Sequence, residues 1–136
     1  MRAIDQTPLF LGHAGNVRNL SSLHAAGIEI VVDLAAEESP AVLSRDLVYC
    51  RFPLLDGGDN PDWLLRLAVE TVADAIRNNV PCLIGCSAGL SRTPAIAVFG
   101  LARGRSLSIE EALHRVSETG PVSISPGLWE QLRKFC

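Results

Sequence analysis

Residues 80–102 read VPCLIGCSAGLSRTPAIAVFGLA, and this stretch decides how the rest of the chain is interpreted. Residues 80–84 form a short apolar run of the kind that makes a buried strand. Residues 93–102 are apolar all round, with Pro94 where the first turn of a helix accepts proline. We therefore predict a strand, a loop over residues 85–92 and a buried helix, in that order.

This loop has the composition of an anion site. In a strand-loop-helix unit, the loop N–H groups and the positive end of the helix dipole converge on one point, which suits a phosphate. Cys86 lies at the base of the loop, where the same field stabilises a thiolate. Arg92 ends the loop with a planar fork that can bind two phosphate oxygens, and Gly85 and Gly89 allow the backbone to turn. The phosphate-binding residues expected here are Ser87, Ala88, Gly89, Leu90, Ser91 and Arg92.

The flanking sequence predicts an α/β fold. The β-branched run at residues 28–34 is typical of a strand covered on both faces, and polar residues every four positions between 61 and 78 predict an amphipathic helix. Strands alternate with helices and lie too far apart for hairpins, so we expect a mostly parallel central sheet flanked by helices. Trp63 and Trp129 are expected to anchor helices on this sheet, with Trp63 alternatively lining the pocket. Further strands are expected at 9–12 and 47–52, a polar turn at 13–19, and helices at 20–26, 108–118 and 126–135.

The composition fits one globular domain over residues 1–136. The 136 residues are 48% hydrophobic and 20% charged, with a net charge of −3, which is ordinary for a globular protein. The basic residues are scattered, and the sequence shows neither a signal-peptide pattern nor an apolar stretch of membrane-spanning length. We therefore expect a cytoplasmic monomer, with no nucleic acid and no membrane among its partners.

The cysteines and histidines give no sign of a metal site. Four cysteines occupy positions 50, 82, 86 and 136, with the spacing of neither a zinc site nor a disulfide framework. The histidines at positions 13, 24 and 114 also lack ligand spacing, so no metal is expected. Cys50 and Cys82 are expected to be core residues, or to resolve an oxidised Cys86 if either lies close enough.

The loop sequence GCSAGLSRT resembles the Cys-x5-Arg-Ser/Thr signature of the protein tyrosine and dual-specificity phosphatases. Other similarities follow in the order of that family: LFLGHAGN near the start, VVDL in the central strand, FPLLD at 52–56 and PVSISPGLWEQL at 121–132. Nearly the whole chain is covered. The resemblance implies a phosphotyrosine phosphatase-like fold, a cysteinyl-phosphate intermediate, no metal or other cofactor, and a general acid on a separate loop.

The same resemblance assigns roles to single residues. Cys86 is expected to be the nucleophile, with Arg92 as the phosphate clamp. Asp56 lies 30 residues before Cys86 and matches the general acid, while Asp59 is its competitor in the same loop. Two glycines after Asp56 are expected to let that loop move. Thr93, at the hydroxyl position of the signature, is expected to hydrogen-bond the cysteine sulfur.

One position departs from the family pattern. The residue before the cysteine is usually histidine, whereas this chain has Gly85, so slower turnover is expected. A catalytically weak or dead phosphate-binding module is an alternative of another class, and the retained cysteine, arginine and acid speak against it. A sulfurtransferase or an arsenate reductase is a third alternative, which fits the loop spacing and the position of Cys86 poorly.

The substrate class is the least specified property. Loop positions 87–91 carry no lysine of the kind that similar lipid phosphatases use for inositol rings. We therefore expect a phosphorylated protein or a small phosphate ester as partner, ahead of phosphoinositides and RNA 5′-phosphates. A chain of this length implies a shallow pocket that accepts phosphotyrosine as well as phosphoserine and phosphothreonine.

Overall fold

A five-stranded sheet forms the centre of the structure, a computed structural model that describes residues 1–135. The strands are β1 (Arg2–Ala3), β2 (Leu9–His13), β3 (Ile30–Ala35), β4 (Val48–Leu54) and β5 (Cys82–Cys86). Their order in the sheet is β1-β2-β5-β3-β4, and every neighbouring pair is parallel except β1 with β2. The predicted mostly parallel central sheet is confirmed.

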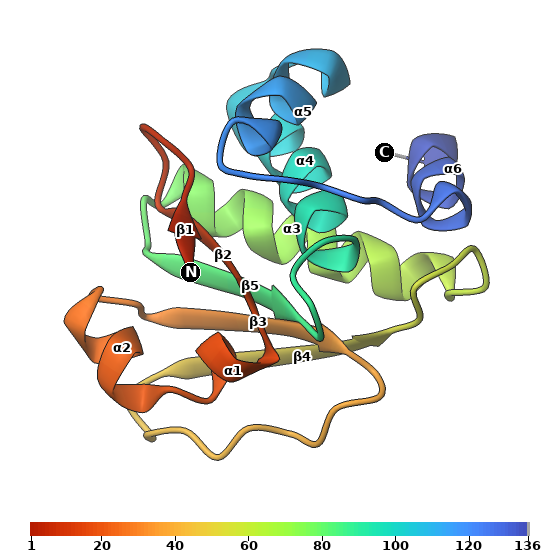
Figure 1. The fold of residues 1–136 in the computed structure, drawn as a ribbon. Coiled ribbons are helices and arrows are strands. Elements are labelled where there is room, and N and C mark those ends of the chain that lie inside the picture. The colour runs from red at the N-terminus through yellow and green to blue at the C-terminus, as the bar shows by residue number, and fades with distance from the viewer. Residues whose placement is uncertain (136) are drawn as a thin grey trace.

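Helices cover both faces of this sheet (Figure 1). They are α1 (Ala14–Val17), α2 (Leu20–Ala25), α3 (Asp62–Arg77), α4 (Arg92–Arg105), α5 (Ile109–Ser117) and α6 (Pro126–Phe135). The first two lie together on one face, and α3, α4 and α6 contribute to the core on the other. Within residues 1–135, no helix is both long enough and apolar enough to cross a bilayer.

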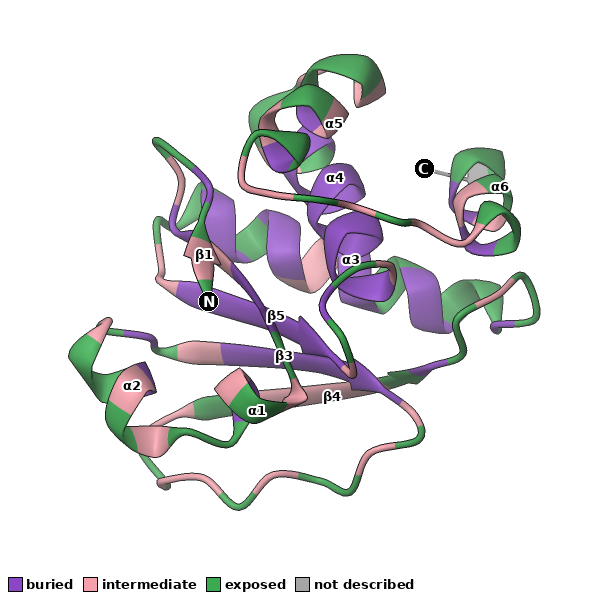
Figure 2. Cartoon of the chain, in the orientation of Figure 1, coloured by how far each residue is buried: buried purple, intermediate pink, exposed green. Residues whose placement is uncertain are grey.

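The central strands β3 and β5 are largely buried (Figure 2), and the two faces of the sheet contribute to separate apolar clusters. Val32 and Ile84 belong to the larger cluster with α3, α4 and α6. Their strand neighbours Val31 and Leu83 belong to the smaller cluster with α1 and α2, because successive strand residues point to opposite faces. The central strands are therefore covered on both sides, as the β-branched run predicts.

The two tryptophans differ in their surroundings. Trp129 of α6 meets Phe99 of α4 edge to face, with ring centroids 5.1 Å apart, so its anchoring role is confirmed. Trp63 is 62% exposed, so the prediction that it anchors α3 to the sheet is wrong. Leu64 and Leu65 occupy the buried side of the first turn of α3, and Trp63 lies on the other side of this amphipathic helix.

Two short elements near the N-terminus escape the sequence pattern. β1 pairs with β2 over two residues, too few for any periodicity to reveal. α1 replaces the expected polar turn because two side chains cap it. The His13 ring accepts a hydrogen bond from the Gly15 N–H at 3.0 Å, and the Asn16 side chain accepts one from the His13 N–H at 2.9 Å. This reciprocal capping stabilises one helical turn in a polar segment.

Candidate active site

The predicted loop joins the carboxyl end of β5 to the start of α4. Cys86 is the last residue of β5 and Arg92 is the first residue of α4, so the thiol and the guanidinium share one pocket. The pocket has a volume of about 270 Å³. Its lining residues are Asp56, Cys86, Ser87, Ala88, Leu90, Ser91, Arg92 and Ser123. Most of the residues predicted for the site are thus brought together, while Gly89 and Thr93 are buried outside this lining.

The backbone of the loop is turned so that N–H groups face its inside. Three loop carbonyls accept hydrogen bonds from outside the loop: that of Ser87 from the Ala14 N–H at 3.3 Å, that of Gly89 from Arg2 Nη2 at 3.1 Å, and that of Leu90 from the Ser123 N–H at 2.7 Å. In a trans peptide the N–H points opposite to the carbonyl. The N–H groups of residues 88, 90 and 91 are therefore directed inward, as an anion cradle requires.

Glycine is required at position 89 for two reasons. Gly89 has a φ of +77°, in the region that residues with a side chain rarely adopt. A Cβ atom at this position would also lie 2.8 Å from the carbonyl oxygen of Gly12 in β2. The tight turn that closes the loop therefore depends on Gly89.

Arg92 presents one edge of its guanidinium to the pocket. Its side chain is 6% exposed. Nη1 donates to the Leu54 carbonyl at 2.9 Å, and Nη1 and Nη2 donate to the two carboxylate oxygens of Glu37 at 2.6 Å each. Nε is buried and has no hydrogen-bond partner among the described residues. Because a buried donor without a partner is costly, the edge formed by Nε and Nη2 is suited to donate to an anion.

Glu37 holds the opposite edge of this guanidinium. The hydrogen bonds from Arg92 lower the pKa of the Glu37 carboxyl to about 2, opposed by partial burial and assisted by the Ser87 hydroxyl. The same hydrogen bonds raise the pKa of Arg92. Both groups are therefore charged throughout the neutral range. No pattern in the sequence indicates Glu37, because its contact with Arg92 joins residues 55 positions apart.

The two candidate acids are placed differently. Asp56 lines the pocket, and its Oδ1 accepts a hydrogen bond of 2.5 Å from the Ser91 hydroxyl. Ser91 Oγ also accepts a hydrogen bond from the Ser125 N–H at 2.8 Å, so it ties Asp56 to the segment before α6. Asp59 is exposed and is not part of the pocket lining.

Thr93 makes a different contact from the expected one. It is fully buried, and its hydroxyl donates to the Gly12 carbonyl at 3.3 Å. It forms no hydrogen bond with the sulfur of Cys86 in this structure. The cause is the neighbouring strand β2, which lies beside β5 and presents its Gly12 carbonyl to the first turn of α4.

A side chain in place of Gly85 has no room. A Cβ atom there would lie 2.3 Å from Cγ2 of Val17. Val17 belongs to α1 and is buried in the smaller apolar cluster. Val17 thus fills the space beside the strand that a larger residue before Cys86 would need. The departure from the family pattern is matched by packing at Val17.

Neither of the other described cysteines can resolve an oxidised Cys86. Cys82 lies four residues earlier on the same strand, a separation of roughly 13 Å, whereas a disulfide needs Cα atoms within about 7 Å. Cys50 is two strands away, in register with Val32 of β3, at roughly 10 Å or more. Burial raises the pKa of Cys82 to about 12 and also raises that of Cys50. Cys82 is a core thiol, whereas Cys50 is only half-buried. Cys136 lies outside the described residues.

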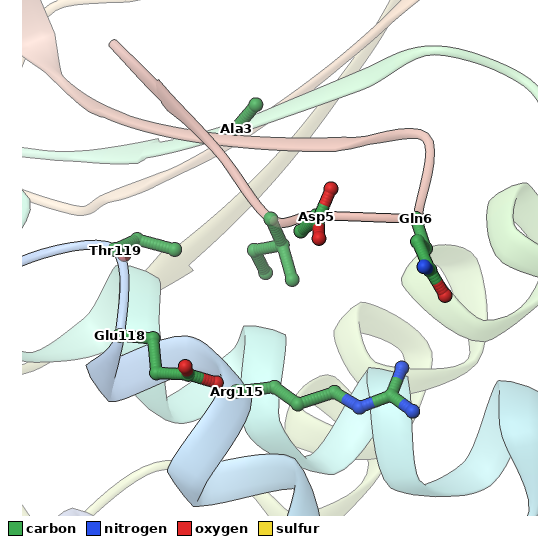
Figure 3. A pocket seen from close by; sticks show the side chains of 7 residues that line it. Ala3, Asp5, Gln6, Arg115, Glu118 and Thr119 are labelled. Atoms are coloured by element: carbon green, nitrogen blue, oxygen red, sulfur yellow. The ribbon is translucent and has the colours of Figure 1, made fainter.

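A second cavity, of about 310 Å³, shares no lining residue with the loop pocket; Figure 3 shows it from close by. It is bordered by Asp5 and Gln6 of the N-terminal segment and by Arg115 and Glu118 at the end of α5. Its lining contains neither a thiol nor a histidine. Cys86 and Arg92 both line the loop pocket, and neither lines this second cavity.

A phosphate loop between a strand and a helix, with a thiol at its base and a guanidinium fork at its end, defines the site of a cysteine-dependent phosphatase. Comparison with known proteins agrees. The family described as dual specificity phosphatase, catalytic domain, matches residues 9–136. Human dual specificity phosphatase 28 is 32% identical over 131 residues, which cover 93% of this chain and 73% of that protein.

Further similarities point the same way. Mouse dual specificity protein phosphatase 14 is 35% identical over 130 residues, which cover 91% of this chain and 63% of that protein. The crystal structure of human DUSP28 has a TM-score of 0.86 at 26% identity, covering 98% of this chain and 94% of that chain. The chain therefore belongs to the dual specificity phosphatase family and is an enzyme of the protein tyrosine and dual-specificity phosphatase class.

Proposed function

We propose that the chain hydrolyses phosphomonoesters with Cys86 as nucleophile and Asp56 as general acid and base. The Cys86 thiolate attacks phosphorus, and an S–P bond forms as the P–O bond to the leaving group breaks. Asp56 gives its proton to the departing oxygen. Water then attacks the cysteinyl phosphate and loses a proton to Asp56, and the S–P bond breaks to release inorganic phosphate and the thiolate.

The observation that carries this proposal is the buried Nε of Arg92, which has no hydrogen-bond partner among the described residues. A buried guanidinium, fixed on one side by Glu37 and Leu54, leaves Nε and one N–H of Nη2 for two oxygens of a phosphoryl group. The inward N–H groups of the loop add further donors, and all of these can follow the charge that develops on the equatorial oxygens. Thr93 supports the loop through its hydrogen bond to Gly12.

We propose phosphorylated proteins as the substrate class, with phosphotyrosine and phosphoserine or phosphothreonine all accepted. The pocket is small, at about 270 Å³, and the side chains of its loop carry no positive charge apart from Arg92. The carboxylates of Glu37 and Asp56 lie beside the loop. This negative charge disfavours polyanions such as phosphoinositides and RNA 5′-phosphates relative to a single phosphoryl group on a peptide.

We further propose that residues 1–136 act as one catalytic domain, as a monomer, in the cytoplasm. The dual specificity phosphatase family model spans residues 9–136 as a single unit. A mechanism that depends on the Cys86 thiolate works in a compartment that keeps thiols reduced.

A substrate panel tests the substrate class. With a chelator present and no added divalent ion, phosphotyrosine, phosphoserine and phosphothreonine peptides are expected to be hydrolysed with kcat/KM at least about tenfold above that for a phosphoinositide or a 5′-phosphorylated RNA, because discrimination acts through transition-state binding. Phosphate release is the measurement. Faster hydrolysis of the lipid or the RNA, or a requirement for a divalent ion, contradicts the proposal.

The phosphate clamp gives a separate prediction. Arg92→Lys is expected to lower kcat/KM by about 10²–10³-fold, because a point charge cannot reproduce two parallel hydrogen bonds to phosphoryl oxygens. Tungstate binding, measured by calorimetry, should weaken in parallel. Arg103→Lys is the matched control, since Arg103 lies on the same helix in an exposed ion pair with Glu70. A clamp variant with kinetics like those of the control would exclude Arg92 from phosphate binding.

A further inference from the structure

The loop that carries Asp56 is held from inside by one buried amide. Asn60 is 6% exposed. Its Oδ1 accepts a hydrogen bond from the Leu55 N–H at 2.8 Å, and its Nδ2 donates to the carbonyls of Leu55 at 3.0 Å and Gly57 at 3.1 Å. The amide therefore binds the backbone on both sides of Asp56 and fixes the residue between them.

Asn60 is in turn attached to α6, more than 60 residues further along the chain. The backbone N–H of Asn60 donates to Gln131 Oε1 at 3.2 Å. Gln131 Nε2 donates to the backbone carbonyl of Asn60 and, at 3.1 Å, to Asp62 Oδ1. The side chain of Gln131 thus satisfies both backbone groups of Asn60. Removing it would take away these side-chain hydrogen bonds between the acid loop and α6.

Backbone packing strengthens this attachment. A Cβ atom on Gly127, in the first turn of α6, would lie 3.0 Å from the backbone nitrogen of Gly58. A Cβ atom on Gly58 would lie 3.2 Å from the carbonyl oxygen of Gly127. The glycine at position 58 thus permits close contact with α6, which differs from the expectation that the glycines serve to make the loop move.

We infer that Asn60, anchored by Gln131, is a positioning residue that holds Asp56 at the leaving-group oxygen. This inference rests on the proposed role of Asp56. The Asp56 carboxylate is exposed and is held at its tip by the Ser91 hydroxyl, so its place depends on the backbone of residues 55–57. That backbone takes its position from Asn60, and Asn60 takes its own from α6.

The expected signature depends on the leaving group. Asn60→Ala should lower kcat/KM for a phosphoserine peptide by about 10- to 100-fold, because a small displacement of a proton donor is costly in rate. With 4-nitrophenyl phosphate, whose leaving group is stable as an anion, the loss should stay below about threefold. Gln131→Ala should show the same pattern with a smaller loss. Because it leaves the buried Asn60 in place, it keeps the test valid if the cavity in Asn60→Ala prevents folding.

Three controls separate positioning from general damage. Asn78→Ala removes an amide that bonds to a backbone carbonyl at the other end of α3, and it should leave both substrates unaffected. Tungstate affinity should be unchanged in Asn60→Ala, because the phosphate loop is intact. In the Asp56→Asn background, adding Asn60→Ala should cause no further loss on the phosphoserine peptide, because both changes act through one carboxyl group.

The outcomes distinguish this inference from the proposed function. Equal losses on both substrates in Asn60→Ala and Gln131→Ala, or an undiminished loss in the Asp56→Asn background, overturn the positioning role. If Asp56→Asn is slow but Asn60→Ala has a normal rate, the positioning role of Asn60 is overturned, while Asp56 remains the general acid. An Asp56→Asn variant with wild-type rates on both substrates overturns the acid assignment, and the role of Asn60 falls with it.

Discussion

Cys86→Ser is expected to abolish turnover, with a loss of roughly 10⁴–10⁶-fold in kcat/KM on 4-nitrophenyl phosphate. The sulfur is the only nucleophile in the proposed step, and a serine hydroxyl in its place stays protonated without a base beside it. The exchange is nearly isosteric at a position only 3% exposed, so the fold and the loop should survive. Tungstate binding by the inactive variant checks that the anion site is intact.

Cys50→Ser is the matched control for this loss. Cys50 is a half-buried thiol of β4, two strands away from β5 and outside the pocket. The variant should keep the turnover of the wild type. If Cys86→Ser retained a tenth or more of the wild-type rate, the nucleophile would have to be another group.

Asp56→Asn is expected to lower kcat/KM for a phosphoserine peptide by roughly 10²–10⁴-fold. An alkyl leaving oxygen needs a proton as the P–O bond breaks, and the amide cannot supply one. The amide oxygen can still accept the hydrogen bond from the Ser91 hydroxyl, so the loop should keep its place. With 4-nitrophenyl phosphate the loss should be much smaller, because less negative charge needs neutralising.

Asp59→Asn tests the competing assignment. Asp59 lies in the same loop, but it is exposed and outside the pocket lining, so its loss should change the rate on either substrate by less than about threefold. Single-turnover rates for both variants across leaving groups decide the matter. A large loss confined to Asp59→Asn would transfer the role to Asp59, and small losses in both would assign proton donation to water or another residue.

Much of the fold could be predicted because its signals are local. The β-branched run at 28–34 became the buried strand β3, and the four-residue repeat at 61–78 became the amphipathic helix α3. The apolar run after Arg92 became α4, which is buried throughout its first eleven residues. In each case the pattern of side chains within one segment determines which face is buried.

The contacts that complete the site could not be predicted, because they join distant segments. Glu37 and its partner Arg92 are 55 residues apart. Asn60 and Gln131 are 71 residues apart. Both pairs consist of common polar residues whose importance appears only when the sheet and α6 bring them together. Trp63 is an error of another kind. Its large apolar side chain suggested burial, but it lies on the exposed side of α3.

Gly85 shows how a departure from a family pattern can be reinterpreted once its neighbours are known. In the sequence it suggested slower turnover. In the structure, Val17 occupies the space that a side chain at position 85 would need, and the loop is ordered by hydrogen bonds to its carbonyls from three other segments. The residues that compensate lie in α1, β1 and the segment before α6, where no motif marks them.

The most direct test of the central claim is to trap the phosphoenzyme. Asp56→Asn is mixed with excess 4-nitrophenyl phosphate, stopped with denaturant within the first turnover and examined by intact mass and peptide mapping. We expect up to one phosphate per chain, attached to the sulfur of Cys86, and none in the Cys86→Ser variant, because hydrolysis of the intermediate is slowed without the base. Turnover without any covalent phosphate, or phosphate attached to another residue, would contradict Cys86 as the nucleophile.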